Sequence, residues 1–356
     1  MGLKMRQKLV STTLLVALAI LIELPVYAAA YPYKPGDQPV ADALNYLRGV
    51  QASDGGIGDF ASSAWAAMAI AAAGEDPHKW NKTNGSPSII DYLKNNRGQL
   101  DHSKATDLAR FILAMSAAGE NPKNIEGTNY VALLKGLYSN GQLGDSSLLN
   151  DDFWGLMALV SAGEEDQAII DNVRAFIKAN QNPDGGWGYG VGLSSDVDDT
   201  AAAIMALTAA GEPRDSEAMM KAVSYLKGKL GEEGGFIYDS IPNSASDSLA
   251  IMALEALGVD VLGDEWTRKG VDPVSHLLSL QNGDGSFSWR AGRDGEALWT
   301  AYAILALLGK PLILGFIVPL PDISNSALMF LASILVLSNA LALTKLKAGK
   351  RDILGR

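Results

Sequence analysis

Residues 181–188 read Gln181-Asn-Pro-Asp-Gly-Gly-Trp-Gly188, a glutamine and an aromatic residue on either side of a glycine turn. Related stretches are Gln51-Ala-Ser-Asp-Gly-Gly-Ile-Gly58 and Gln281-Asn-Gly-Asp-Gly-Ser-Phe287, with a reduced form at Gly234-Gly235-Phe236. Asp-Gly-Gly permits a sharp bend, and we expect the glutamine to tie each turn to a neighbouring helix end. The aromatic ring is expected to pack between adjacent repeats. The motif therefore predicts a repeated structural unit.

An alanine-rich apolar run follows each turn and ends in glycine. The runs are Ala64–Ala73, Leu108–Ala118, Phe153–Ala162, Ala201–Ala210, Leu249–Leu257 and Leu298–Leu308. Each run is apolar on nearly every face, which predicts a buried inner helix. The closing glycines, which favour the left-handed conformation after a helix end, are Gly74, Gly119, Gly163, Gly211, Gly258 and Gly309.

Partner runs interleave apolar with charged residues at helical spacing, which predicts an outer ring of helices facing water. Examples are Ala41–Gly49, Ile90–Asn95, Val173–Ala179, Ala222–Lys227 and Val274–Leu280. The closing glycines are 45, 44, 48, 47 and 51 residues apart, enough for two helices and two turns in each repeat. We therefore predict an all-α fold, an (α/α)6 toroid of six helical hairpins, over residues 31–315.

The turns resemble the glutamine–tryptophan repeats of terpenoid cyclases and the related prenyltransferase β subunits, over roughly residues 41–309. The resemblance implies an α/α toroid with its cavity on the ring axis, at the N-terminal ends of the inner helices. Aromatic residues near those ends are the candidate ligand-binding residues, although each is also a natural core residue. They are Trp65, Trp154, Trp187, Tyr189, Trp289 and Trp299.

Residues 195–201 read Ser195-Asp-Val-Asp-Asp-Thr-Ala201 and resemble the Asp-x-Asp-Asp motif of class II cyclases such as squalene–hopene cyclase. The resemblance implies that Asp198 is the acid that protonates an alkene or epoxide, with Asp196 and Asp199 as its tuning partners. Such an acid must stay protonated, and neighbouring carboxylates in an apolar site raise its pKa.

Helix capping is the structural alternative for this motif. Counting back from each closing glycine, the repeats carry Ser62, Asp107, Asp151, Asp199, Ser246 and Ala297 at the position of Asp199. Five of the six are capping residues, which explains Asp199 as an N-cap. At the position of Asp198 they carry the less consistent set Ala61, Thr106, Asn150, Asp198, Ala245 and Glu296. Chemistry beyond architecture is therefore expected at Asp198.

Other protein families with the same toroid match this sequence less well. Squalene–hopene cyclases use two helical domains on the cytoplasmic side, whereas this chain offers one ring. No zinc site is expected, because the chain has no cysteine and its histidines, His78, His102 and His276, are far apart in the repeat frame. The lack of cysteine also excludes a thioester. Cobalamin carriers usually add a β-rich domain, so cobalamin stays an open alternative and no cofactor is predicted.

The two ends predict export and anchoring. Residues 1–30 combine Lys4, Arg6 and Lys8 with an apolar run and small residues, the pattern of a signal peptide; an uncleaved anchor is the alternative. Residues 326–344 carry no charge and are near the minimum length of a transmembrane helix. A linker over 316–325 precedes them, and the basic tail at 345–356 predicts a cytoplasmic C-terminus with the toroid outside the cell membrane.

The net charge of the predicted toroid bears on the class of partner that it can bind. The chain has 29 basic and 40 acidic residues, of which 1–28 and 345–356 hold eight basic and two acidic ones. The remaining 21 basic and 38 acidic residues give about −17, which argues against nucleic acid as a partner.

The main functional prediction is a membrane-anchored toroid that binds a small or apolar, isoprenoid-like ligand in its axial cavity. One alternative is a class II terpene cyclase or isomerase with Asp198 as general acid. A second alternative is a structural surface protein, which a cavity plugged by side chains would favour.

Overall fold

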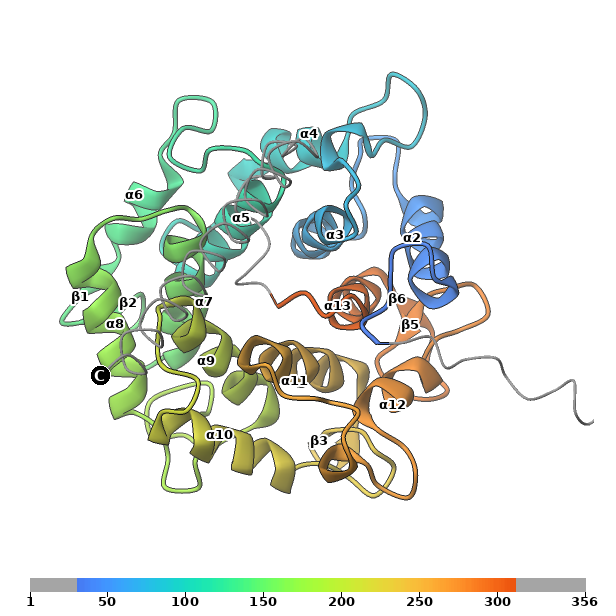
Figure 1. Ribbon diagram of the computed structural model, residues 1–356. Helices are drawn as coiled ribbons and strands as arrows, with labels where there is room; N and C mark the ends of the chain where they lie inside the picture. The colour runs from blue at the N-terminus through green and yellow to red at the C-terminus, as the bar shows by residue number, and fades with distance from the viewer. Residues whose placement is uncertain (1–30, 312–356) are drawn as a thin grey trace, which may run out of the picture.

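Six alanine-rich helices form an inner ring in the computed structural model, which describes residues 31–311 (Figure 1). Each inner helix packs against the next, and α13 packs against α3, so the ring closes. These helices are buried on nearly all faces, as their composition predicts. The inner ring consists of α3 (Phe60–Ala72), α5 (Ala105–Ala117), α7 (Leu149–Ser161), α9 (Val197–Ala209), α11 (Ser244–Leu257) and α13 (Ala297–Leu307).

Six further helices surround this ring. In α8, for example, Ile170, Val173 and Ile177 are buried at helical spacing against the inner helices. The outer ring consists of α2 (Gln38–Val50), α4 (Ile89–Asn95), α6 (Tyr130–Lys135), α8 (Gln167–Ala179), α10 (Glu217–Gly228) and α12 (Pro273–Ser279). The predicted (α/α)6 toroid is thus confirmed over the described residues. Helix α6 has only six residues, too few for periodicity to reveal it.

Short hairpins and 3₁₀ turns connect the helices. The antiparallel hairpins pair β1 (Tyr138–Ser139) with β2 (Gln142–Leu143), β3 (Ile237–Tyr238) with β4 (Ile241–Pro242), and β5 (Phe287–Ser288) with β6 (Gly295–Glu296). The 3₁₀ turns are η1 (Pro77–Lys79), η2 (Arg97–Gln99) and η3 (Asp264–Trp266). Each hairpin precedes an inner helix in the chain, by at most five intervening residues, so it lies toward the end of the ring where those helices begin.

The glutamine of each turn performs the predicted role. Gln181 Nε2 donates to Gly185 O within its own turn and to Ala218 O in the next outer helix, both at 2.8 Å. Gln281 Nε2 donates to Pro39 O at 2.8 Å and so joins the last repeat to the first. The six closing glycines have φ between +57° and +78°, which confirms the left-handed conformation expected there.

The predicted signal peptide (1–30), linker (316–325), transmembrane helix (326–344) and basic tail (345–356) lie outside the described residues, as do residues 312–315 of the predicted toroid. Within residues 31–311, none of the helices has the length and apolarity that a membrane crossing requires.

Candidate active site

One face of each inner helix is directed toward the ring axis. Side chains at the second and sixth positions of a helix are four residues apart and therefore share a face. The second positions are Ala61, Thr106, Asn150, Asp198, Ala245 and Leu298, and the sixth are Trp65, Arg110, Trp154, Ala202, Leu249 and Tyr302. All of these except Ala61 line an axial cavity. The repeat thus places Asp198 in a ring of residues that face the cavity.

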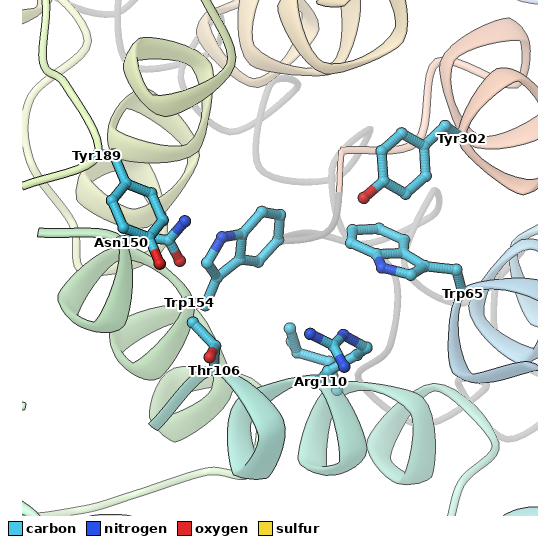
Figure 2. A pocket seen from close by; sticks show the side chains of 8 residues that line it. Trp65, Thr106, Arg110, Asn150, Trp154, Tyr189 and Tyr302 are labelled. Carbon is cyan, nitrogen blue, oxygen red and sulfur yellow. The ribbon is translucent and has the colours of Figure 1, made fainter. Parts of the chain in front are cut away.

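The cavity has two lobes. The α5 lobe, of about 240 Å³, is lined by Trp65, Thr106, Arg110, Leu113, Asn150, Trp154, Tyr189 and Tyr302 (Figure 2). The α9 lobe, of about 500 Å³, is lined by Asn150, Trp154, Tyr189, Asp196, Asp198, Asp199, Ala202, Tyr238, Asn243, Ala245, Leu249, Trp289, Leu298, Trp299 and Tyr302. Both lobes share Asn150, Trp154, Tyr189 and Tyr302, so they adjoin one another.

Asp198 lies in the wall of the α9 lobe. Its Oδ1 accepts a hydrogen bond from Ser246 Oγ over 2.5 Å, the one hydrogen bond to this carboxyl among the described residues. Burial, aided by the negative charges of Asp196 and Asp247, raises the pKa of Asp198 to about 6, while the Ser246 bond opposes the rise. A large fraction of this carboxyl is therefore protonated in mildly acidic solution, and its second oxygen is free to meet a ligand.

Asp196, and not Asp199, is the N-cap of α9. Its Oδ1 accepts from the backbone N–H of Asp199 over 2.8 Å. The capping role predicted for Asp199 is wrong, because α9 begins at Val197 and Asp199 occupies the third helical position. Burial first, and then the charge of Asp196, raises the pKa of Asp199, so its carboxyl is favoured in the neutral form.

The sixth repeat also departs from the expected register. Helix α13 has 11 residues, whereas α3, α5, α7 and α9 have 13 each. Counting back from Gly309 therefore selected Glu296 and Ala297, which lie at the helix start. The residues that match Asp198 and Asp199 in the structure are Leu298 and Trp299.

Five of the six predicted aromatic residues line the cavity, namely Trp65, Trp154, Tyr189, Trp289 and Trp299. The Trp65 ring stands edge-on to Trp154, with centroids 5.5 Å apart, and to Tyr302, at 4.3 Å. The structure places Trp187 elsewhere: it is fully buried, and its Nε1 donates to Ile177 O over 2.8 Å. Trp187 is thus a core residue that fixes its turn to α8.

The fourth helical position holds each turn against its inner helix. There the side chains of Ser63, Asp152, Thr200, Asp247 and Thr300 accept hydrogen bonds from the backbone N–H groups of Ile57, Leu143, Trp187, Phe236 and Phe287. Asp247 also pairs with His276 Nδ1 over 2.7 Å. These bonds fix the helix starts, and with them the carboxyls of the site.

Sequence reasoning missed several lining residues, above all Arg110, Tyr238, Asn243 and Tyr302, and the hydrogen-bond partner Ser246. A signal for Arg110 was present. Thr106 stands at the position of Asp198, and Arg110 follows four residues later, on the same helical face.

Comparison with known proteins agrees with this geometry. The family model described as the squalene-hopene cyclase N-terminal domain matches residues 154–236, which include the three aspartates. Two curated relatives are named drimenyl diphosphate synthase. The relative from Streptomyces showdoensis is 30% identical over 42% of this chain, and that from Streptantibioticus cattleyicolor is 25% identical over 37%. The match spans only 28% and 35% of the relatives' own lengths.

Solved structures share the fold at low sequence identity. The type II terpene cyclase MstE from Scytonema gives a TM-score of 0.55 at 13% identity, over 76% of this chain and 97% of its own. The ent-copalyl diphosphate synthase from Streptomyces platensis gives 0.50 at 16% identity, over 70% of this chain and 50% of its own. A glycosidase also gives 0.50, at 11% identity, over 76% of this chain and 95% of its own, so the fold alone does not fix the chemistry.

The MstE comparison also concerns the size of the fold. We expected a cyclase of this kind to need a second helical domain. The match covers nearly all of the solved MstE chain and three quarters of this one. A type II terpene cyclase can therefore have about the size of this single toroid.

Proposed function

We propose that this chain, which belongs to the α/α-toroid superfamily of terpenoid cyclases, is a class II cyclase that protonates an isoprenoid alkene with Asp198. The observation that carries the proposal is the place of Asp198: its carboxyl lies in the wall of an aromatic-lined cavity, and burial raises its pKa to about 6. General acids must hold their proton at the working pH, and this environment favours that state.

The proposed reaction is an isomerisation. The Asp198 carboxyl transfers its proton to one carbon of a terminal alkene, whose π electrons form the new C–H bond and leave a cation on the other carbon. The next alkene attacks that cation and closes a ring, and transfer of a proton from the last cation to water yields the cyclic product. The Asp198 carboxylate then regains a proton from water, so no oxidant or reductant is needed.

The lining suits a cationic intermediate. Trp154, Trp289, Trp299 and Tyr302 present aromatic rings to the α9 lobe. The negative faces of such rings stabilise cations. A protein with a purely structural role would not require an open cavity with an acid in its wall. Binding without chemistry would not require an acid with a raised pKa.

Product analysis tests the proposal. The full chain is incubated with squalene and with polyprenyl substrates that carry diphosphate, alcohol or acid head groups, and products are separated by mass spectrometry. We expect a cyclic isomer of at least one substrate, lost in Asp198→Asn. Asp239→Asn, an exposed aspartate outside the lining, serves as the matched control and should retain activity. Unchanged substrates throughout, or equal products from the Asp198→Asn variant, would contradict the proposal.

The location of the toroid is a separate proposal, supported by the sequence pattern of residues 1–30 and 326–356. The signal segment would export the toroid and the apolar segment would hold it at the outer face of the membrane. Protease added to intact cells should then digest the toroid. Protection of the toroid in intact cells, with digestion after lysis, would contradict this orientation.

A further inference from the structure

Arg110 is the one basic side chain in the described lining of either lobe. It extends from the sixth position of α5, and Figure 2 shows its guanidinium between Trp65 and Trp154. Its one ion pair among the described residues is with Asp107, at 3.5 Å, so most of its five N–H donors are available. Its side chain is partly exposed, so these donors can meet a ligand in the lobe.

Two further polar groups accompany Arg110 in the α5 lobe. The Thr106 hydroxyl lies one helical turn before it on the same face. Asn150 also lines both lobes, and its side-chain amide hydrogen-bonds the Asp199 carboxyl. The Arg110 guanidinium and the Thr106 hydroxyl can both donate to an accepting oxygen of a ligand.

The charges of the lining exclude a heavily charged head group. Asp196 places a carboxyl in the lining of the α9 lobe, and Asp107 already offsets part of the Arg110 charge. A diphosphate carries at least two negative charges, which the one guanidinium of this lining, shared with Asp107, cannot neutralise. One negative charge, or a neutral hydroxyl, can be accommodated.

The two lobes also separate the two ends of a substrate. Arg110 belongs to α5 and Asp198 to α9, with α7 between them in the ring. The Tyr302 hydroxyl lies within the influence of both charges: burial chiefly raises its pKa, Asp198 adds to the rise, and Arg110 opposes it. Because the two lobes adjoin, a substrate with its head at Arg110 can extend its tail toward Asp198.

We propose that the α5 lobe binds the head group of the isoprenoid, that this head is a carboxylate or a hydroxyl and not a diphosphate, and that Arg110 selects it. This inference rests on the proposed cyclase function. Arg110 is a specificity residue in this scheme, and Asp198 is the catalytic acid.

Binding is measured by tryptophan fluorescence in the full chain that carries Asp198→Asn, which removes turnover. The probes share one prenyl tail: geranylgeranoic acid, geranylgeraniol and geranylgeranyl diphosphate. We expect the acid and the alcohol to bind roughly tenfold or more tightly than the diphosphate. Adding Arg110→Gln should weaken acid binding by about 10- to 100-fold and alcohol binding far less, the difference expected for a charged hydrogen bond.

Two matched variants keep the test independent of folding. Arg110→Lys should retain part of the acid affinity, because it keeps the charge. Asp107→Asn should strengthen acid binding, because it removes the competing counter-ion. Loss of folding cannot produce a gain in affinity. Tightest binding of the diphosphate, or an Arg110→Gln variant with unchanged preference, would overturn the inference.

The two proposals can fail separately. If the acid binds as expected but the chain with Asp198 intact yields no cyclic product, the head-group site stands and the cyclase function falls. If cyclic products form with equal efficiency from the acid and the diphosphate, and Arg110→Gln changes neither, the cyclase function stands and the head-group site falls.

Discussion

Ser246 Oγ donates to Asp198 Oδ1 over 2.5 Å, and this bond links inner helices α11 and α9 at the cavity wall. Asn243 Nδ2 donates in turn to Ser246 Oγ over 3.0 Å, while Asn243 Oδ1 accepts from the backbone N–H of Ser246. The hydroxyl is thus oriented by the same residue that caps α11. The result is one fixed oxygen on Asp198 and one left for the substrate.

Removing the Ser246 hydroxyl should change both the rate and its pH dependence. The hydrogen bond lowers the pKa of Asp198, so Ser246→Ala should move the loss of activity to higher pH. The maximal rate should fall by about tenfold, because the carboxyl loses its fixed orientation. The pH profile of kcat/KM checks this, with Ser246→Thr as the hydroxyl-retaining control. A shift to lower pH would contradict the role assigned to Ser246.

The wild-type pH profile follows from Asp198. The acid acts only when protonated, and burial raises its pKa from 3.8 to about 6. Activity should therefore be highest below that value and decline as the pH rises through it, by about tenfold for each further unit. Initial rates measured across the acidic and neutral range test this. A rate that increases with pH through this range would be incompatible with Asp198 as the acid.

Asp152 should make stability fall with rising pH. Burial raises its pKa from 3.8 to about 8, and its Oδ2 has no partner among the described residues. The raised pKa favours the neutral carboxyl in the folded protein. The contribution of Asp152 to the free energy of unfolding is therefore fully present below its pKa in the unfolded chain, and it is lost as the pH rises to about 8. Asp152→Asn should melt at a temperature that depends less on pH than the wild type, measured by calorimetry.

Asp239→Asn provides the comparison for Asp152, because Asp239 is exposed. Its melting temperature should follow that of the wild type at every pH. An Asp152→Asn variant with the wild-type pH dependence would show that Asp152 does not ionise on unfolding.

Gln281 should stabilise the junction between the last and first repeats. Its Nε2 donates to Pro39 O and to Gly285 O, so Gln281→Ala leaves both carbonyls without this donor. The free energy of unfolding should fall by about 1–3 kcal/mol. Denaturant unfolding measures the change, with Gln167→Ala on the exposed face of α8 as the control, expected within about 0.5 kcal/mol of wild type. Equal effects of the two variants would contradict the junction role.

The fold could be predicted because the sequence of each repeat specifies its own helices and turns. Closing glycines, apolar runs and glutamine turns depend on short-range geometry, and six copies reinforce one another. The start of α13 was predicted wrongly because this helix is two residues shorter than most of the others, and an apolar run does not show where a helix begins. The N-cap of α9 was assigned to Asp199 instead of Asp196 for the same reason. Both residues are suitable caps, and only the backbone dihedrals show where the helix begins.

The site could be predicted only where a motif marked it. Asp198 belonged to a recognisable motif, and tryptophans near helix starts are few. Ser246 becomes a site residue only when the ring closes and brings α11 beside α9, whereas the spacing of Arg110 from Thr106 was a signal that sequence reasoning did not use. Trp187 was misplaced because an aromatic residue beside a turn suits the core and a cavity equally.

Deuterium incorporation tests the central claim most directly. The full chain is incubated in deuterated water with the substrate that gives a cyclic product, and the product mass is compared with that formed in ordinary water. Protonation by an exchangeable acid should place one deuterium on the former alkene carbon, with no incorporation and no product in Asp198→Asn. A cyclic product without deuterium would mean that the reaction does not begin with protonation, and would contradict the role of Asp198.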